Sequence, residues 1–232
     1  QVLSSTSGGV LSWATVGSSL TNFTESVNAT GVNATVPVVR LIATNAAANV
    51  DVALSPKGTG ALTAQMADNT AAGGGKRGAN AVDWQTIRGT STQAAIGAYS
   101  VIGGGNANSA TNSYSIVSGG NSNTASGLTA TVAGGGSNQA TQSYAFIGGG
   151  AQNAAQGSYT TIGGGASNAA IGDYSSVLGG GANAVYGPTG SNYSTISGGQ
   201  SNTANSTYSY IGGGLMNSVD GNYSVISGGR EN

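Results

Sequence analysis

Tyr159-Thr-Thr-Ile-Gly-Gly-Gly-Ala-Ser-Asn-Ala-Ala-Ile-Gly-Asp173 is one of nine copies of a unit that fills the chain from residue 99 to residue 232. The copies open at Tyr99, Tyr114, Thr129, Tyr144, Tyr159, Tyr174, Tyr193, Tyr208 and Tyr223. The numbers of successive openings differ by 15, except for one difference of 19 between Tyr174 and Tyr193. A fixed short period is the sequence signature of a solenoid. The pattern therefore predicts an all-β fold, a β-solenoid (β-roll or β-helix) of nine 15-residue coils.

Three positions of the unit do not vary. With the opening residue as position 0, Asn occupies position 9 in every copy: Asn108, Asn123, Asn138, Asn153, Asn168, Asn183, Asn202, Asn217 and Asn232. If each unit is one coil, equivalent residues stack about 4.8 Å apart, so nine coils give a rod of about 43 Å. The amides can then hydrogen-bond along the column, and the sequence predicts a structural Asn ladder.

Gly-Gly at positions 5 and 6 is the second invariant feature. The first four pairs are Gly104, Gly105, Gly119, Gly120, Gly134, Gly135, Gly149 and Gly150. Glycine adopts positive φ, or lets backbones approach closely, at little cost. These residues are predicted to form a corner of each coil.

The alternation of side chains along strands predicts a thin interior. Positions 1, 3, 5, 9, 11 and 13 point one way, which gives each coil a single large apolar core residue, such as Ile162. The opposite face would carry a column of tyrosines, and such a stripe is unusual on a monomer. Packing of three parallel chains would bury it. The candidates for this packing are Tyr99, Tyr114, Tyr144, Tyr159, Tyr174, Tyr193, Tyr208 and Tyr223. We therefore expect a homotrimer, with a monomeric solenoid as the alternative.

Residues 1–98 lack the repeat and suggest three segments. Residues 1–35 are predicted to be an extended linker or shaft. Residues 36–66 are predicted to be a β-strand shaft segment, with strands at Val36–Thr44, Val50–Leu54 and Ala61–Met66. Together these form an extended, partly intertwined β segment. Residues 67–98 are predicted to be a transition loop that caps the first coil, before the solenoid at 99–232. We interpret both ends as cuts in a longer protein, because the ninth unit is incomplete.

Composition excludes several kinds of chemistry. Only 6% of residues are charged and the net charge is -1, so the chain offers no basic surface for nucleic acid. It contains no Cys and no His, so we predict no metal site and no cofactor site. No apolar stretch is long enough to span a membrane, and no membrane insertion is expected. The glycines before Lys76 lack the spacing of a phosphate-binding loop, because Arg77 follows.

Four stretches of the sequence resemble bacteriophage tail fibre proteins. They are Gln1–Thr15, Leu54–Leu62, Gly75–Arg88 and the Gly- and Asn-rich repeats themselves. The repeats are more distantly similar to the heads of YadA-type trimeric autotransporter adhesins, whose units are about one residue shorter. The first resemblance implies a trimeric fibre on a virion tail. Its partners would be other tail proteins and a bacterial surface receptor, either a glycan or an outer-membrane protein. The second implies a bacterial cell-surface adhesin, which is the alternative. Neither carries over catalytic residues.

Two other functions fit the sequence less well. A glycan-cleaving tailspike needs a pair of carboxylates, and within the repeats only Asp173, Asp220 and Glu231 are acidic. Ice binding needs a regular Thr array, whereas position 2 is irregular. We predict that the chain is not an enzyme and has no catalytic residue. The insertion Pro188–Ser191, which accounts for the one longer step between units, is predicted to bulge from a corner without breaking the ladder.

Overall fold

The computed structural model describes residues 3–5, 11–13, 23–28, 38–43, 56–186 and 193–232. Every regular element in these ranges is a β-strand. The chain divides into two compact units, residues 1–55 and residues 56–232. The prediction of an all-β chain is confirmed for the described residues.

The first unit contains two antiparallel strand pairs. Strand β1 (Leu3–Ser5) pairs with β2 (Leu11–Trp13), and β3 (Phe23–Asn28) pairs with β4 (Val38–Ala43). Strand β3 comes from the segment predicted to be an extended linker, so this pair joins the two predicted segments 1–35 and 36–66. Strand β4 occupies the described part of the strand predicted at 36–44. The strand predicted at 50–54 lies outside the described residues.

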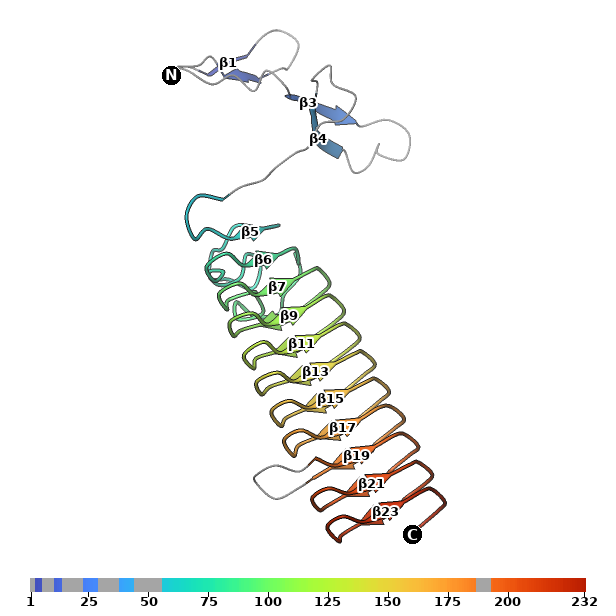
Figure 1. Ribbon diagram of the computed structural model, residues 1–232. Helices are drawn as coiled ribbons and strands as arrows, with labels where there is room; N and C mark the ends of the chain where they lie inside the picture. The colour runs from blue at the N-terminus through green and yellow to red at the C-terminus, as the bar shows by residue number, and fades with distance from the viewer. Residues whose placement is uncertain (1–2, 6–10, 14–22, 29–37, 44–55, 187–192) are drawn as a thin grey trace. The chain divides into compact units, whose positions relative to one another are not determined.

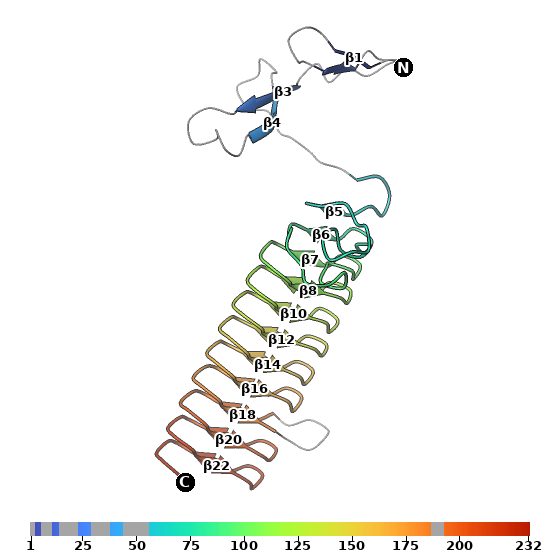
Figure 2. The ribbon, with the colours of Figure 1, turned by 180° about the vertical axis from the view of Figure 1, so that it is seen from behind.

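The second unit is a parallel β-solenoid with two main sheets (Figures 1 and 2). The eleven-stranded sheet contains β5 (Leu62–Thr63), β6 (Val82–Asp83), β7 (Val101–Ile102), β9 (Ile116–Val117), β11 (Thr131–Val132), β13 (Phe146–Ile147), β15 (Thr161–Ile162), β17 (Ser176–Val177), β19 (Thr195–Ile196), β21 (Tyr210–Ile211) and β23 (Val225–Ile226). The eight-stranded sheet contains β8 (Ser109–Ala110), β10 (Thr124–Ala125), β12 (Gln139–Ala140), β14 (Ala154–Ala155), β16 (Ala169–Ala170), β18 (Ala184–Val185), β20 (Thr203–Ala204) and β22 (Ser218–Val219).

Each unit of the repeat forms one coil, as predicted. Positions 2 and 3 contribute a strand to the first sheet, and positions 10 and 11 contribute one to the second. Single parallel bridges at position 7 form a third ladder, as between Ala151 and Ala166. Every strand is parallel to its neighbours in the stack because the chain returns to the same place after each coil. Backbone bonds join the coils; for example, the Ala169 N–H donates to the Asn183 carbonyl at 2.8 Å.

The interior follows the predicted alternation except at the corner. Position 3 is fully buried in the first eight coils, as at Ile162, and position 11 is buried as Ala or Val. Position 1 and the Asn at position 9 also point inward. Position 5, which the alternation places inside, is only half-buried, as at Gly134. The prediction fails there because the strand geometry ends before the corner, where position 6 takes positive φ.

The ladder continues across the insertion. Residues 187–192 lie outside the described residues, but the strands on either side of them keep their register. Strand β17 pairs with β19 with Ser176 opposite Thr195, and β18 pairs with β20 with Ala184 opposite Thr203. The prediction that the insertion at this corner leaves the ladder intact is confirmed.

An irregular coil precedes the first repeat. Its strand β6 pairs with β7, and Ile87 bridges to Asn106. Asn80, with φ of 55°, precedes β6 as Tyr99 precedes β7. Asp83 lies opposite Ile102 and therefore occupies the place of the core Ile. Strand β5, from the segment predicted as 36–66, pairs with β6, so residues 56–66 belong with the solenoid.

Candidate functional surfaces

The Asn ladder exists, and each rung bonds mainly to backbone. The Asn153 Oδ1 accepts the N–H of Asn168 at 3.0 Å. Its Nδ2 donates to the carbonyl of Gly149 in the same coil and to that of Gly165 in the next coil, both at 2.9 Å. The side chain is fully buried. Each amide therefore ties the glycine corner of two successive coils together, which gives the Asn a structural role. The other eight predicted asparagines occupy equivalent places; Asn232, in the last coil, is partly buried.

A glutamine starts the ladder. The Gln85 Oε1 accepts the N–H of Asn108 at 2.9 Å, as a preceding Asn would. Its Nε2 donates to the carbonyls of Asn108 and Gln93 at 2.8 and 2.7 Å. Gln85 is 1% exposed. The irregular coil thus offers the Asn at position 9 of the first repeat the same side-chain acceptor that each later repeat receives from the Asn before it.

The glycine corner depends on position 6. At this position φ lies between 84° and 112° in all nine coils. A Cβ on Gly165 would lie 2.1 Å from the carbonyl oxygen of Gly180, the equivalent glycine in the next coil. Position 5 is less demanding, because a Cβ on Gly164 would have nothing within 4 Å. The Gly-Gly pair therefore forms a corner of each coil, and mainly position 6 requires glycine.

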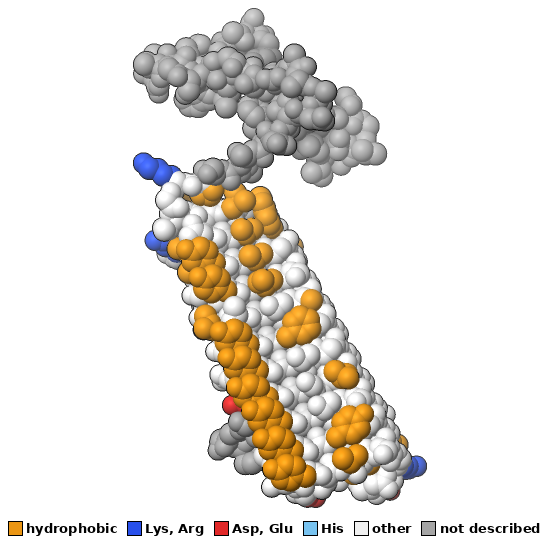
Figure 3. All heavy atoms as spheres, in the orientation of Figure 1, with side chains coloured by type: hydrophobic (Ala, Val, Ile, Leu, Met, Phe, Trp, Pro, Cys, Tyr) orange, Lys and Arg blue, Asp and Glu red, His pale blue; other side chains and the backbone are white. Residues whose placement is uncertain are grey.

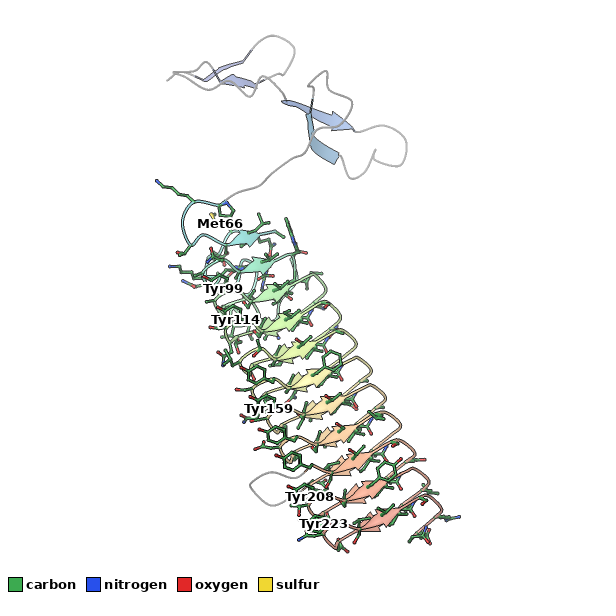
Figure 4. The ribbon with its side chains drawn as sticks, viewed as in Figure 1. Met66, Tyr99, Tyr114, Tyr159, Tyr208 and Tyr223 are labelled. Carbon is green, nitrogen blue, oxygen red and sulfur yellow. The ribbon has the colours of Figure 1, made fainter. Side chains whose placement is uncertain are left out.

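The predicted tyrosine column forms a stacked stripe along one corner of the rod (Figures 3 and 4). We call the eight tyrosines at position 0 the tyrosine stripe. Neighbouring rings lie 4.6–5.1 Å apart between centroids and within 2–12° of parallel. Thr129 interrupts the stack between Tyr114 and Tyr144, and Leu128 is exposed beside it. The ring faces therefore pack against each other within the chain, which leaves ring edges and hydroxyl groups for any partner.

The tyrosines of the stripe have an unusual backbone. At position 0, φ lies between 50° and 59°, the left-handed region that bulky side chains rarely adopt. Such a residue costs about 1–3 kcal/mol, and an aromatic stack returns about 0.5–1.5 kcal/mol per pair. Seven of the eight tyrosines are 43–51% exposed, and Tyr223 is 74% exposed. Stacking thus offsets part of the backbone cost, and the stripe still presents a long half-exposed surface.

A second surface lies beside the stripe on the eleven-stranded sheet, where Figure 3 shows separate hydrophobic groups. We call the outward side chains at positions 2 and 4 of the nine coils the strand face. At position 2 it carries Val101, Ile116, Thr131, Phe146, Thr161, Ser176, Thr195, Tyr210 and Val225. Position 4 is Gly, Ser or Ala, except at Leu178. The strand face contains no charged side chain.

The irregular coil holds a buried charge cluster. The Asp83 Oδ2 lies 2.8 Å from the Arg77 Nε and 3.0 Å from the Arg88 Nη2. The three side chains are at most 2% exposed. Arg77 also donates to the carbonyls of Gly73 and Gly75, and Arg88 to that of Ala72. Because Asp83 stands where a repeat has Ile, this cluster ends the apolar interior and joins the capping loop to it.

Removal of the central carboxylate should destabilise the cap. Asp83→Ala leaves two buried guanidinium groups without a counter-charge, a change that costs about 3–5 kcal/mol. We expect this loss in the free energy of unfolding from urea titrations followed by circular dichroism. Glu231→Ala is the control, because the Arg230–Glu231 pair is exposed and worth at most about 1 kcal/mol. Equal losses in both variants would contradict a structural role for the cluster.

Asp68 lies in the capping loop near this cluster, on the surface. The backbone N–H and hydroxyl of Thr70 donate to its carboxylate and hold the pKa of Asp68 below its ordinary value. The Gly73 N–H donates to the same oxygen at 3.1 Å. These bonds favour the ionised carboxylate, so they support the loop above the unfolded pKa and are lost as the pH falls through the folded pKa.

The described residues show no cluster of side chains that could hold a metal ion. Across 56–186 and 193–232, no three acidic side chains come together as metal ligands would. Asp173 accepts the N–H of Ser158, and Asp220 accepts from Asn205, so each serves a local contact in its own coil pair. That the chain has no catalytic, cofactor or metal site, and is not an enzyme, stays a prediction. Within those ranges, no helix is long and apolar enough to cross a bilayer.

Comparison with known proteins gives no family assignment. No family model matches the chain, and no curated protein sequence matches it either. The tyrosine stripe, the strand face and the capping coil are therefore interpreted from their own geometry.

Sequence reasoning missed the structural roles of Asp83, Gln85 and the left-handed backbone at positions 0 and 8. At position 8 the side chains vary from that of Ala107 to that of Met216, so residue type gives no signal there. Asp83 and Gln85 could have been found by aligning Val82 with Val101 as position 2. The capping coil runs from Asn80 to Ala98, which is longer than a repeat, and this irregular length hid the alignment.

Proposed function

We propose that this chain is a structural and adhesive segment of a bacteriophage tail fibre, in which a rigid homotrimeric rod takes part in attachment to a bacterial surface. The observation that carries the proposal is the tyrosine stripe, broken only at Thr129, on an in-register rod. The function is mechanical: the rod holds contacts at a fixed distance, and several chains multiply weak contacts into avidity. Its place would be the virion tail, next to other tail proteins, with a surface glycan or an outer-membrane protein as receptor.

Rigidity is supported by the hydrogen bonding. Backbone bonds at three ladders and one amide rung join each pair of successive coils. A rung such as Asn153 is buried and fully bonded, so the rod cannot bend there without breaking bonds. Apart from the large apolar groups of the tyrosine stripe and the strand face, the side chains on the rod surface are mostly short and uncharged, which suits a spacer.

The stripe favours other copies of the chain as partner. Within its two stacks neighbouring ring centroids lie 4.6–5.1 Å apart, and seven of the eight tyrosines are about half-exposed. A partner that covers the whole stripe must repeat along the rod with the same spacing from one coil to the next. Another copy of this chain has that spacing. Packing of parallel copies would bury the ring edges left free by the stack. The number three comes from the resemblance to tail fibres.

The mass of the native protein in solution tests the assembly. We expect native mass spectrometry to give three times the chain mass of 22.2 kDa. Replacement of Tyr144, Tyr159 and Tyr174 by Ser should shift the mass to that of one chain, because it removes the centre of the stripe. Tyr186→Ser is the matched control, since Tyr186 is equally exposed at position 12, away from the stripe.

The two possible failures are distinct. A single-chain mass for the wild type would overturn the homotrimer. Circular dichroism should show that the triple variant keeps its β signal; if it does not, replacement of the same tyrosines by Phe provides a second test, because Phe keeps the stack and should keep the trimer. A Phe variant of single-chain mass would show that stacking and apolar edges do not hold the chains together.

A bacterial trimeric surface adhesin is the alternative function for the same rod. Fluorescently labelled protein should attach to cells from a panel of Gram-negative isolates in either case. Inhibition of phage adsorption to those cells by the soluble protein supports the tail fibre. Attachment without any inhibition of adsorption, for every phage that infects the bound isolates, supports the adhesin.

A further inference from the structure

We propose that the strand face binds an extended neutral glycan, which lies along the rod and stacks on Phe146 and Tyr210. This inference rests on the proposed attachment function and names its ligand class and binding face. The tyrosine stripe is less suitable for sugars because its ring faces are already covered by neighbouring rings. Phe146 and Tyr210 stand on strands β13 and β21, apart from that stack.

Both rings lean over the sheet. A Cβ on Gly148, which follows Phe146 and Ile147, would lie 3.6 Å from the Phe146 Cε1, so the edge of the ring covers this glycine. The Tyr210 hydroxyl lies 3.0 Å from the hydroxyl of Ser197, in the preceding coil, and accepts a hydrogen bond from it. Tyr210 therefore reaches across the sheet. The two side chains are 40% and 41% exposed, so a large part of each remains accessible to solvent.

The surroundings of the rings favour a neutral sugar chain. Between Phe146 and Tyr210, position 2 carries only the hydroxyl side chains of Thr161, Ser176 and Thr195. Pyranose rings combine apolar C–H faces with hydroxyl edges, and this alternation of aromatic surface and hydroxyl groups is complementary to them. The face has no charged group to pair with an acidic sugar. A protein partner would need a more continuous apolar centre than these separated groups provide.

The spacing along the rod sets the length of the ligand. Tyr210 lies four coils after Phe146, which separates the two rings by about 19 Å. Leu178, 54% exposed at position 4, lies two coils from each. A glycan must therefore span several sugar units to contact both rings. Short oligosaccharides can use one ring only.

Binding to printed polysaccharides tests the proposal. The full chain is applied to an array that carries neutral and acidic bacterial polysaccharides side by side. We expect signal on neutral glycans. Phe146→Ala and Tyr210→Ala should each weaken binding about tenfold, and the double variant should lose the signal. Tyr186→Ala, which removes an aromatic group of similar exposure at position 12, should bind as the wild type does.

Chain length provides a second measurement. Titration calorimetry with fragments of the bound polysaccharide should show a steep gain in affinity once the fragment spans both rings. This gain should disappear in either single variant. Binding by acidic glycans only, or equal binding by wild type and double variant, would overturn the inference. Wild-type protein that attaches to cells but to no neutral glycan would also overturn it, yet leave the attachment function standing. Wild-type protein that binds neither cells nor neutral glycans would overturn both the glycan inference and the attachment function.

Discussion

Gly165→Ala should break the solenoid at its middle. The Cβ of the new alanine would lie 2.1 Å from the carbonyl oxygen of Gly180 and 2.7 Å from the Nδ2 of Asn168. The backbone there also has a φ of 90°, which alanine rarely adopts. Neither neighbour can move, because both belong to ladders that run along the rod. We expect the free energy of unfolding to fall by at least about 4 kcal/mol, which is at the upper end of the range for single substitutions.

Hydrogen exchange resolved by mass spectrometry checks this result. Coils interact only with their neighbours, so the damage should spread outward from residue 165 and divide the unfolding transition in two. Gly164→Ala is the matched control in the same coil, since a Cβ there meets nothing within 4 Å. Its free energy of unfolding should lie within about 1 kcal/mol of that of the wild type. Equal damage from the two substitutions would contradict our account of the corner.

Asn153→Asp should lower the free energy of unfolding nearly as much as Gly165→Ala does, although it keeps the shape of the side chain. The Nδ2 of Asn153 donates to two glycine carbonyls at 2.9 Å. A carboxylate would place an oxygen against both carbonyls in a fully buried site. An unpaired buried charge costs several kcal/mol, so we expect a loss of about 3–5 kcal/mol in the free energy of unfolding at neutral pH.

The stability loss of the Asn153→Asp variant should depend on pH. Burial and the two carbonyls favour the protonated acid, so the pKa of the new carboxyl in the folded state should rise above its unfolded value. The part of the penalty that arises from the buried charge should then be absent below the unfolded pKa and grow as the pH rises through the folded pKa. Urea titrations at several pH values measure it. Asn121→Asp, at an exposed position whose Oδ1 accepts from Ser122, should change little at any pH. A pH-independent loss at residue 153 would contradict the proposed origin of the penalty.

The repeat was predictable because its period, its interior and its ladder all depend on residue type. An invariant Asn and a β-branched residue at fixed positions can be read directly, and Asn153 and Ile162 lie where the pattern places them. Strand alternation failed at position 5, because a turn does not keep the period of a strand. The positive φ of Tyr159 was not predictable either, since tyrosine has no preference for that region and only the closed coil enforces it.

The surfaces were predictable only in part. The tyrosines could be placed in one column, but their mutual stacking depends on side-chain rotamers that the sequence does not specify. The sequence alone predicts an apolar surface that packs against other chains. The structure shows that its ring faces are already paired, so only edges and hydroxyl groups are free. The charge cluster around Asp83 was hidden for another reason: its three members become neighbours only through the irregular coil.

The Asn ladder also has a direction, and this gives the chain an order of assembly. The side chain of Asn108 bonds to the N–H of Asn123 and to the carbonyl of Gly120, both in the following coil. A finished coil therefore holds a prepared template for the one after it, and Gln85 supplies the template for the first. A ribosome delivers the coils in the same order. We expect each newly made segment to settle onto a completed surface, so that the rod grows from its cap one coil at a time.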